Sequence, residues 1–233
     1  MMASNIQRQD LVCLSTTGWS EVLRRNWDPP SRQCLAHWAG ERLPLVVTQQ
    51  TSRIGDATPG DVLDLGLPAP LRWLRHRIGL RIPTDAVTQV MSFPSLPAIN
   101  SLLPSASMAR WALLHECLAA LSMPTHVYGS YGWQLLTGLV YLHPESDIDL
   151  LVRVPDAGGA DRAASALARC GIDQPRLDGE LLFADGSAVS WREWRRWRHG
   201  DTNDLLVKRR TGATLTHDDC WLHAMTNVAE GSA

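Results

Sequence analysis

Two aspartates separated by one residue, Asp147 and Asp149, stand at the start of an apolar run over residues 150–152. Side chains alternate along a β-strand, so both carboxylates leave the same face, about 7 Å apart along the chain. Two like charges on one face repel, and partial burial raises the free energy needed to ionise both. A divalent cation removes that penalty, and hard carboxylate oxygens suit Mg²⁺, which completes its shell with water and substrate phosphates. We therefore predict that both aspartates are metal ligands; the alternative is a strand end whose aspartates face solvent.

A Gly-Ser pair is the second candidate for chemistry. Gly129 and Ser130 lie between a predicted strand over 125–129 and a predicted helix over 131–138. A turn at this place directs free backbone N–H groups, and the positive end of the helix, toward an anion such as a phosphate. The alternative is that Ser130 only caps its helix, which is a common role of serine. Both roles are compatible, because capping leaves further N–H donors for a ligand.

The segments that must position these residues have a clear pattern in the second half of the chain. Apolar residues at helical spacing predict helices from about 106 to 122 and over 158–171. Strands are predicted over 146–154 and 204–209, and a β-hairpin over 179–194. The candidate residues thus fall on strands, or at the turn between a strand and a helix.

The first half of the chain has weaker signals. Residues 10–90 contain short strand-like runs, two helix candidates and a basic segment over 71–82. A proline-rich stretch over 92–107 follows and is interpreted as a connector. We therefore predict an N-terminal domain over 1–93 and a second, catalytic domain over 94–233.

Composition excludes several classes of protein. An apolar content of 45% and a charged content of 20% in 233 residues are typical of a soluble globular protein with a sizeable core. The net charge of -2 argues against a general nucleic-acid binder, and no apolar run reaches the length of a membrane span. The five cysteines are scattered and include no CxxC pair, which fits reduced thiols. We expect a cytoplasmic protein that binds neither nucleic acid nor membranes.

The order strand, Gly-Ser, helix and strand with Asp-x-Asp resembles the nucleotidyltransferase superfamily that includes polymerase β. Within it, the motif GS-x-x-WQ-x-LTGL-x-YL-x-x-x-SDIDLL over 129–151 resembles one branch. That branch is the phosphoribosyl-dephospho-CoA transferases of malonate decarboxylase, also called malonate decarboxylase holo-acyl-carrier-protein synthases. Shorter similarities such as QDLVCL, LDLGLP and DLLVKR extend the resemblance over nearly the whole chain.

This resemblance implies a fold and a reaction. The fold is α/β in the broad sense (α+β): a polymerase-β-like nucleotidyltransferase domain with a mixed sheet, preceded by a small N-terminal α+β domain. The reaction transfers the prosthetic group of triphosphoribosyl-dephospho-CoA to a serine of the apo acyl-carrier subunit of malonate decarboxylase, with release of pyrophosphate. Asp147 and Asp149 would hold Mg²⁺ or Mn²⁺, and Gly129, Ser130 and Lys208 would contact the triphosphate. Lys208 is singled out because the other 21 basic residues are all arginine.

A third carboxylate on a neighbouring strand normally completes such a site. Glu180 and Glu193 are the candidates, and Glu180 is preferred as the third catalytic residue beside Asp147 and Asp149. Two other functions remain open: an ATP-using adenylyltransferase on the same fold, and an inactive nucleotidyltransferase fold that acts as a binding module. The intact aspartates and Gly-Ser pair argue against the inactive module.

Overall fold

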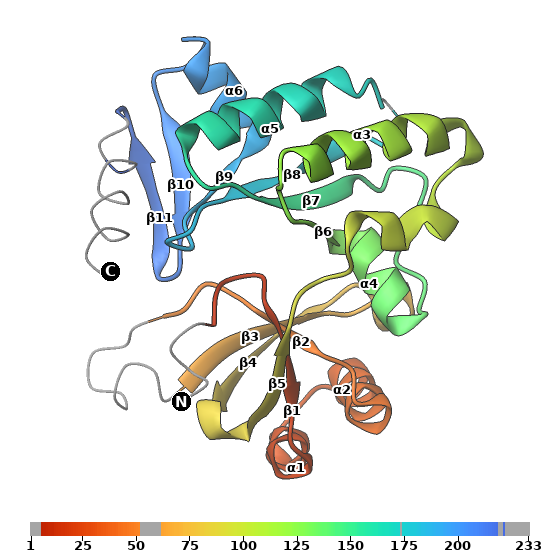
Figure 1. Ribbon diagram of the computed structural model, residues 1–233. Coiled ribbons are helices and arrows are strands. Elements are labelled where there is room, and N and C mark those ends of the chain that lie inside the picture. Colours follow the sequence, from red (N-terminus) through yellow and green to blue (C-terminus); the bar gives the residue numbers. More distant parts are fainter. Residues whose placement is uncertain (1–5, 52–61, 173, 219–220, 222–233) are drawn as a thin grey trace. The chain divides into compact units, whose positions relative to one another are not determined.

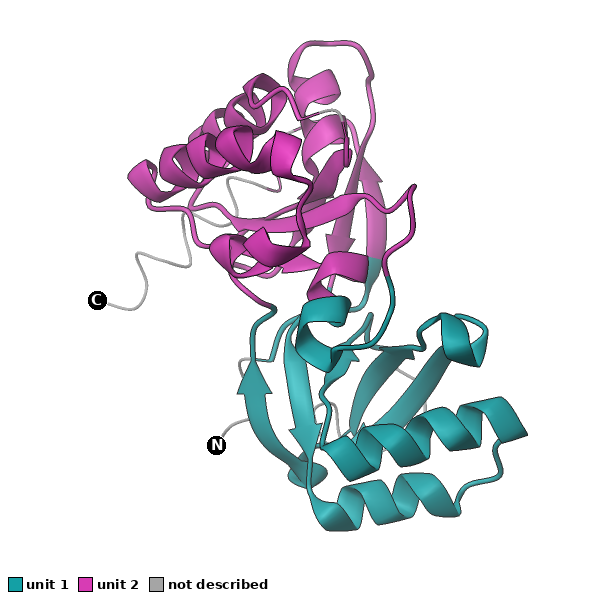
Figure 2. Cartoon of the chain, turned by 90° about the vertical axis from the view of Figure 1, so that its right-hand side faces the viewer, with its two compact units in different colours: residues 1–93, 133–141, 210–212 teal, residues 94–132, 142–209, 213–233 magenta. Residues whose placement is uncertain are grey.

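The computed structural model describes residues 6–51, 62–172, 174–218 and 221, and the chain forms two compact units (Figure 2). The first unit comprises residues 1–93, 133–141 and 210–212, and the second comprises residues 94–132, 142–209 and 213–233. Two short segments from the second half of the sequence therefore belong with the N-terminal residues. Each unit has its own sheet and helices, which confirms the predicted α+β class.

The first unit contains a five-stranded sheet with the order β4-β3-β2-β1-β5 (Figure 1). Its elements are β1 (Leu11–Leu14), α1 (Thr16–Arg24), α2 (Pro29–Glu41), β2 (Leu45–Val47), β3 (Val62–Pro68), β4 (Arg77–Pro83) and β5 (Val87–Met91). Every second residue of β3 and β4 is buried, as expected for strands with one face on a core. Ser15 and Asp28 cap α1 and α2 by accepting hydrogen bonds from Gly18 N and Ser31 N.

The second unit contains a six-stranded mixed sheet with the order β11-β10-β9-β8-β7-β6. Its elements are α3 (Met108–Ala120), β6 (Thr125–Tyr128), β7 (Ile148–Arg153), α5 (Ala157–Arg169), β8 (Leu177–Leu182), β9 (Ala188–Ser190), α6 (Trp191–Arg198), β10 (Leu205–Arg209) and β11 (Gly212–Thr216). Strands β7 and β8 are parallel and joined through α5, whereas β6 and β9 pair with them in the antiparallel sense. Helix α4 (Gly129–Thr137) begins directly after β6.

Helices α3, α5 and α6 cover one face of the six-stranded sheet (Figure 1). Trp111 of α3 and Trp194 of α6 are buried in this core together with Leu150 and Val152 of β7. Helix α5 contributes mostly alanines, and small side chains allow a helix to lie close to a sheet. Since side chains alternate along β7, the residues between these core positions project from the opposite face of the sheet.

The stretch over 92–107, which was interpreted as a connector, contains the boundary between the two units; it forms 3₁₀ turns over Leu96–Leu102 and Ser105–Ser107 and buries Leu96 in the core. Two local predictions need correction. The second strand of the hairpin ends at Ser190, whose hydroxyl accepts a hydrogen bond from Glu193 N and thereby starts α6. Helix α4 begins at Gly129, two residues earlier than expected. Among the described residues, no helix combines the length and the apolar character that crossing a membrane requires.

Gly179 allows β7 and β8 to pair closely. It lies opposite Leu150 in the parallel register, and its φ of +131° is in a region that favours glycine. A Cβ at this position would lie 2.7 Å from the carbonyl carbon of Leu150, a backbone atom that cannot move aside alone. The pairing of these two strands therefore requires glycine at position 179.

We expect Gly179→Ala to lower the free energy of unfolding by about 2–4 kcal/mol, because it combines backbone strain with a clash. Gly158→Ala is the matched control in the same unit, since an added Cβ there meets only the ends of flexible side chains. Urea denaturation followed by circular dichroism measures both variants. Equal stability of the two variants would contradict the role assigned to Gly179.

Candidate active site

Acidic side chains gather on the sheet face that α3, α5 and α6 do not cover. Asp149 of β7 lies opposite Tyr128 of β6 on one side and opposite Asp178 of β8 on the other. Residues in register on neighbouring strands project from the same face, so the two aspartates are adjacent. Glu180 lies two residues after Asp178 and therefore shares this face.

A tight turn places Asp147 immediately before β7. The backbone N–H of Ser146 donates to the carbonyl of His143 at 2.9 Å, and the N–H of His143 donates to the Ser146 hydroxyl at 3.0 Å. Ser146 is buried, so this turn is fixed from inside the unit. The first residue of the Asp-x-Asp motif thus has a defined position although it lies outside the strand.

The turn at Gly129 lies against the carboxylate of Asp149. Gly129 has a φ of +61°, and a Cβ at this position would lie 2.8 Å from Cγ of Asp149. Only glycine combines this backbone conformation with this close approach. Gly129 and Ser130 are the first two residues of α4, so the N–H groups that begin the helix lie beside the acidic face. The structure therefore brings together the Gly-Ser pair and the second aspartate.

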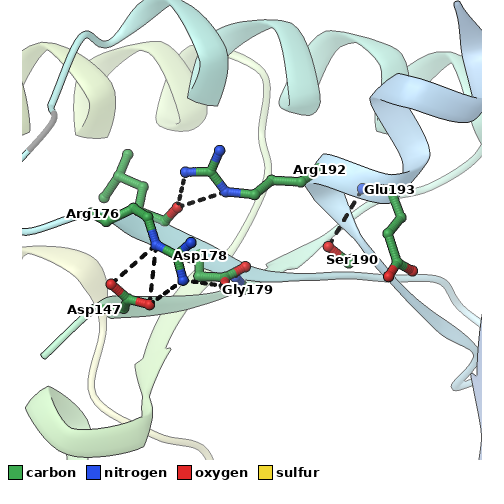
Figure 3. A network of polar contacts seen from close by, with 8 residues as sticks. Asp147, Arg176, Asp178, Gly179, Ser190, Arg192 and Glu193 are labelled. Atoms are coloured by element: carbon green, nitrogen blue, oxygen red, sulfur yellow. Dashed lines mark hydrogen bonds and ion pairs between the residues drawn. The ribbon is translucent and has the colours of Figure 1, made fainter. Parts of the chain in front are cut away.

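Asp178 is an acidic residue that the sequence reasoning missed. Figure 3 shows its carboxylate near that of Asp147, with the guanidinium of Arg176 between them. Arg176 Nε donates to both oxygens of Asp147 at 3.2 Å, and Arg176 Nη2 donates to Asp178 Oδ2 at 3.4 Å. The signal for Asp178 was present in the sequence, because its spacing from Glu180 in Asp178-Gly179-Glu180 matches that of the Asp-x-Asp motif.

The two glutamates considered from the sequence have different surroundings. Glu180 is 5% exposed and accepts a hydrogen bond from Lys208 Nζ at 2.7 Å, so the chain's only lysine is paired on this same face. Glu193 lies on α6 with an exposed side chain, apart from Asp147 and Asp178 in Figure 3. Its neighbour Arg192 donates to the carbonyl of Leu177 at 2.7 Å and ties α6 to the start of β8.

Burial and neighbouring charge act strongly on Asp149. Burial is the largest cause that raises the pKa of its carboxyl, and the negative charges of Asp178, Asp147 and Glu180 raise it further, to about 7. The positive charge of Arg176 opposes this effect. The face therefore carries more negative charge than its own cations neutralise, and a bound cation would lower the pKa of Asp149.

The donor set suits a hard divalent cation. Asp149 of β7, Asp178 of β8 and Asp147, immediately before β7, offer carboxylate oxygens, the ligand type that Mg²⁺ and Mn²⁺ prefer. Among the residues described, however, no three His, Cys, Asp or Glu side chains are already grouped as a metal site. Asp147 and Asp178 are instead arranged around the guanidinium of Arg176.

The tryptophan-glutamine motif that follows the Gly-Ser pair has a structural role. Trp133 is buried among Trp38, Phe93 and Tyr141 of the first unit, with ring centroids 5.5–6.5 Å apart. The Gln134 side chain accepts a hydrogen bond from Tyr141 N at 3.0 Å, and the Tyr141 hydroxyl donates to the carbonyl of Pro68 at 2.7 Å. The buried members of the motif therefore hold residues 133–141 in the first unit.

Comparison with known proteins decides the family. The chain matches the model of the phosphoribosyl-dephospho-CoA transferase MdcG C-terminal domain over residues 95–219, and that of the MdcG N-terminal domain over residues 7–93. It belongs to the phosphoribosyl-dephospho-CoA transferase family. The resemblance seen in the sequence is confirmed, and the chain is an enzyme of the transferase class.

Individual relatives agree with this family. The chain is 35% identical to the phosphoribosyl-dephospho-CoA transferase of Bradyrhizobium diazoefficiens over 202 residues. This matched region covers 86% of this chain and 85% of that protein. It is 33% identical over 209 residues to the enzyme of the same name from Xanthomonas campestris, covering 89% and 92% of the two chains. No solved structure matches this chain.

The raised pKa of Asp149 predicts how stability depends on pH in this transferase. Because its folded-state pKa of about 7 exceeds the ordinary aspartate value of 3.8, the stability that it contributes is complete below about pH 4 and is lost as pH rises through 7. Asp149→Asn removes the ionisation. We expect the variant to exceed the wild type by about 1–4 kcal/mol in free energy of unfolding at pH 8, since three pKa units correspond to about 4 kcal/mol at most.

Urea denaturation in EDTA at pH 5 and pH 8 measures this difference. The gain of Asp149→Asn at pH 8 should shrink at pH 5, where the wild-type carboxyl is already protonated. Asp201→Asn, a change at an exposed loop aspartate, is the control and should show no such dependence. A gain that is equal at both pH values would refute the assigned pKa.

Proposed function

We propose that this chain transfers the prosthetic group of triphosphoribosyl-dephospho-CoA to a serine of the apo acyl-carrier subunit of malonate decarboxylase, releasing pyrophosphate. The observation that carries the proposal is the cluster of Asp147, Asp149 and Asp178 beside the N-terminus of α4, in a chain of this family. Such a cluster suits the transfer of a phosphoryl-linked group, where the protein mainly positions the reactants and balances charge. The scattered cysteines, of which the four described are free thiols, suit the proposed cytoplasmic setting.

Asp147 and Asp149 are the proposed ligands of Mg²⁺ or Mn²⁺, with Asp178 as the third carboxylate. When bound, the metal supplies positive charge that neutralises the phosphate oxygens of the donor. Asp178 is preferred to Glu180 because it lies in register with Asp149, whereas the carboxylate of Glu180 is held by Lys208. This assignment replaces the one favoured from sequence.

The bonds that change in the reaction define what the other residues have to do. A bond forms between the serine oxygen of the carrier and the phosphorus nearest the ribose of the donor, while the bond from this phosphorus to pyrophosphate breaks. The serine proton passes to a carboxylate of the cluster, for which Asp178 is the proposed acceptor. The N–H groups at Gly129 and Ser130 and the positive end of α4 bind the phosphates.

Lys208 is proposed to bind the triphosphate as a point charge. Its side chain is 36% exposed, so part of the ammonium group remains accessible while Glu180 holds it in place. An ammonium group carries three donors, and one hydrogen bond to Glu180 leaves two for phosphate oxygens. Glu180 then positions Lys208 and does not bind the metal.

The transfer itself is tested by intact mass spectrometry of the carrier. Incubation of the purified protein with Mg²⁺, triphosphoribosyl-dephospho-CoA and an apo carrier subunit should add the mass of the prosthetic group to one carrier serine. Asp147→Asn should reduce the rate at least about 100-fold, because it removes a carboxylate that balances charge in the transition state. Glu193→Gln changes an acidic residue that lies outside the cluster, so this variant should keep nearly full activity.

Two outcomes of this assay count against the proposal. Transfer of AMP from ATP, without transfer from the dephospho-CoA donor, would indicate the adenylyltransferase that shares the fold. Transfer at an undiminished rate by Asp147→Asn would show that the acidic face is not the reaction centre.

Steady-state kinetics separate the roles of Asp178 and Lys208. Asp178→Asn should lower kcat by about 100-fold or more with a small change in KM, because a proton acceptor acts in the transition state. Lys208→Met should mainly raise the KM for the donor, by about 10-fold, and leave the KM for the carrier unchanged. If Glu180→Gln lowers kcat as severely as Asp178→Asn, Glu180 is the third carboxylate after all.

A further inference from the structure

The guanidinium of Arg176 occupies the position between two of the proposed metal ligands. Its Nε is 3.2 Å from each oxygen of Asp147, and its Nη2 donates both to Asp147 Oδ2 and, at 3.4 Å, to Asp178 Oδ2 (Figure 3). Both carboxylates are partly buried, with side chains 29% and 33% exposed. One side chain thus bridges acidic groups from two neighbouring strands.

The backbone of Arg176 is fixed while its side chain can move. The carbonyl of Arg176 accepts a hydrogen bond from Ile148 N at 2.9 Å, which holds the residue beside the start of β7. Its side chain is 57% exposed, so the guanidinium can leave the carboxylates without crossing the protein interior. Ion pairs of such exposed arginines are individually weak, which makes the pair reversible.

A metal ion and this guanidinium would use the same oxygens. Both oxygens of Asp147 are hydrogen-bonded to Arg176, so a cation cannot bind Asp147 in the usual way while the pair persists. The positive charge of Arg176 also lowers the pKa of Asp149, against the effect of the neighbouring carboxylates. In both respects Arg176 takes the place of a cation.

We propose that Arg176 is a built-in counter-ion that occupies Asp147 and Asp178 in the metal-free enzyme and must leave before a metal binds them. This inference rests on the proposed function only in taking Asp147, Asp149 and the third carboxylate, Asp178, as metal ligands. Arg176 offsets part of the negative charge of the acidic face between turnovers. It also weakens the binding of metal alone, because the apparent dissociation constant rises as the fraction of unpaired protein falls.

The test measures Mn²⁺ binding by electron paramagnetic resonance in the absence of donor and carrier. Arg176→Gln should bind Mn²⁺ about 3- to 10-fold more tightly than the wild type, which corresponds to a paired state populated roughly 70–90% of the time. Arg176→Lys keeps the charge but lacks the two-pronged guanidinium, and should show an intermediate affinity. Arg195→Gln removes the same charge from an exposed position on α6 and should match the wild type.

A second readout is the rise in melting temperature on adding Mn²⁺, since a ligand that binds only the folded state stabilises it by RT ln(1 + [L]/Kd). The rise should be larger for Arg176→Gln than for the wild type. The proposal is overturned if Arg176→Gln binds no more tightly than the wild type, or if Arg176→Lys binds as weakly as the wild type.

Failure of the metal site itself gives a different result. If Asp149→Asn binds Mn²⁺ as well as the wild type does, the proposed ligands are wrong and the role of Arg176 is overturned with them. If binding is lost in Asp149→Asn but unchanged in Arg176→Gln, the metal site stands and only the counter-ion role is refuted.

Discussion

Repulsion between carboxylates on one face of the six-stranded sheet is the constraint on which the site depends. Asp149 is placed between β6 and β8 in a partly buried position, and its neighbours Asp147 and Asp178 are also acidic. A fold does not gather such charges for stability, because each raises the free energy of ionising the others. The surrounding features reduce this repulsion: Arg176 bridges two of the aspartates, Lys208 neutralises Glu180, and the start of α4 adds the positive end of a helix.

Much of this arrangement follows from local sequence. The alternation of side chains in residues 147–149 is enough to place two carboxylates on one face, and glycine before serine is enough to suggest a turn at the start of a helix. The pairing of Lys208 with Glu180 is different, since it joins residues 28 positions apart through β9, and no local pattern specifies that register. Asp178 was overlooked because it precedes the predicted hairpin, although it shares the spacing of the Asp-x-Asp motif.

Other differences come from tertiary packing. Three prolines indicate a connector over residues 92–107, but they do not predict that Leu96 and Ile99 are buried in the core or that Trp111 Nε1 donates to the Leu96 carbonyl. The tryptophan, glutamine and tyrosine of the segment over 133–141 make the contacts that hold it within the first unit, and Val140, with 67% exposure, is its most exposed large apolar residue. Such motif residues identify the family through its packing as well as through its chemistry.

Because Lys208 is the only lysine in the sequence, a reagent for side-chain amines modifies the acidic face selectively. An acylating reagent directed at side-chain amines has a single target in this sequence, Lys208, and an endoproteinase specific for lysine has a single cleavage point, after the same residue. The ammonium group is hydrogen-bonded to Glu180, so labelling at this amine also disturbs that contact. Labelling of the side-chain amine therefore reports on one sheet face, without the background that a surface rich in lysine would produce.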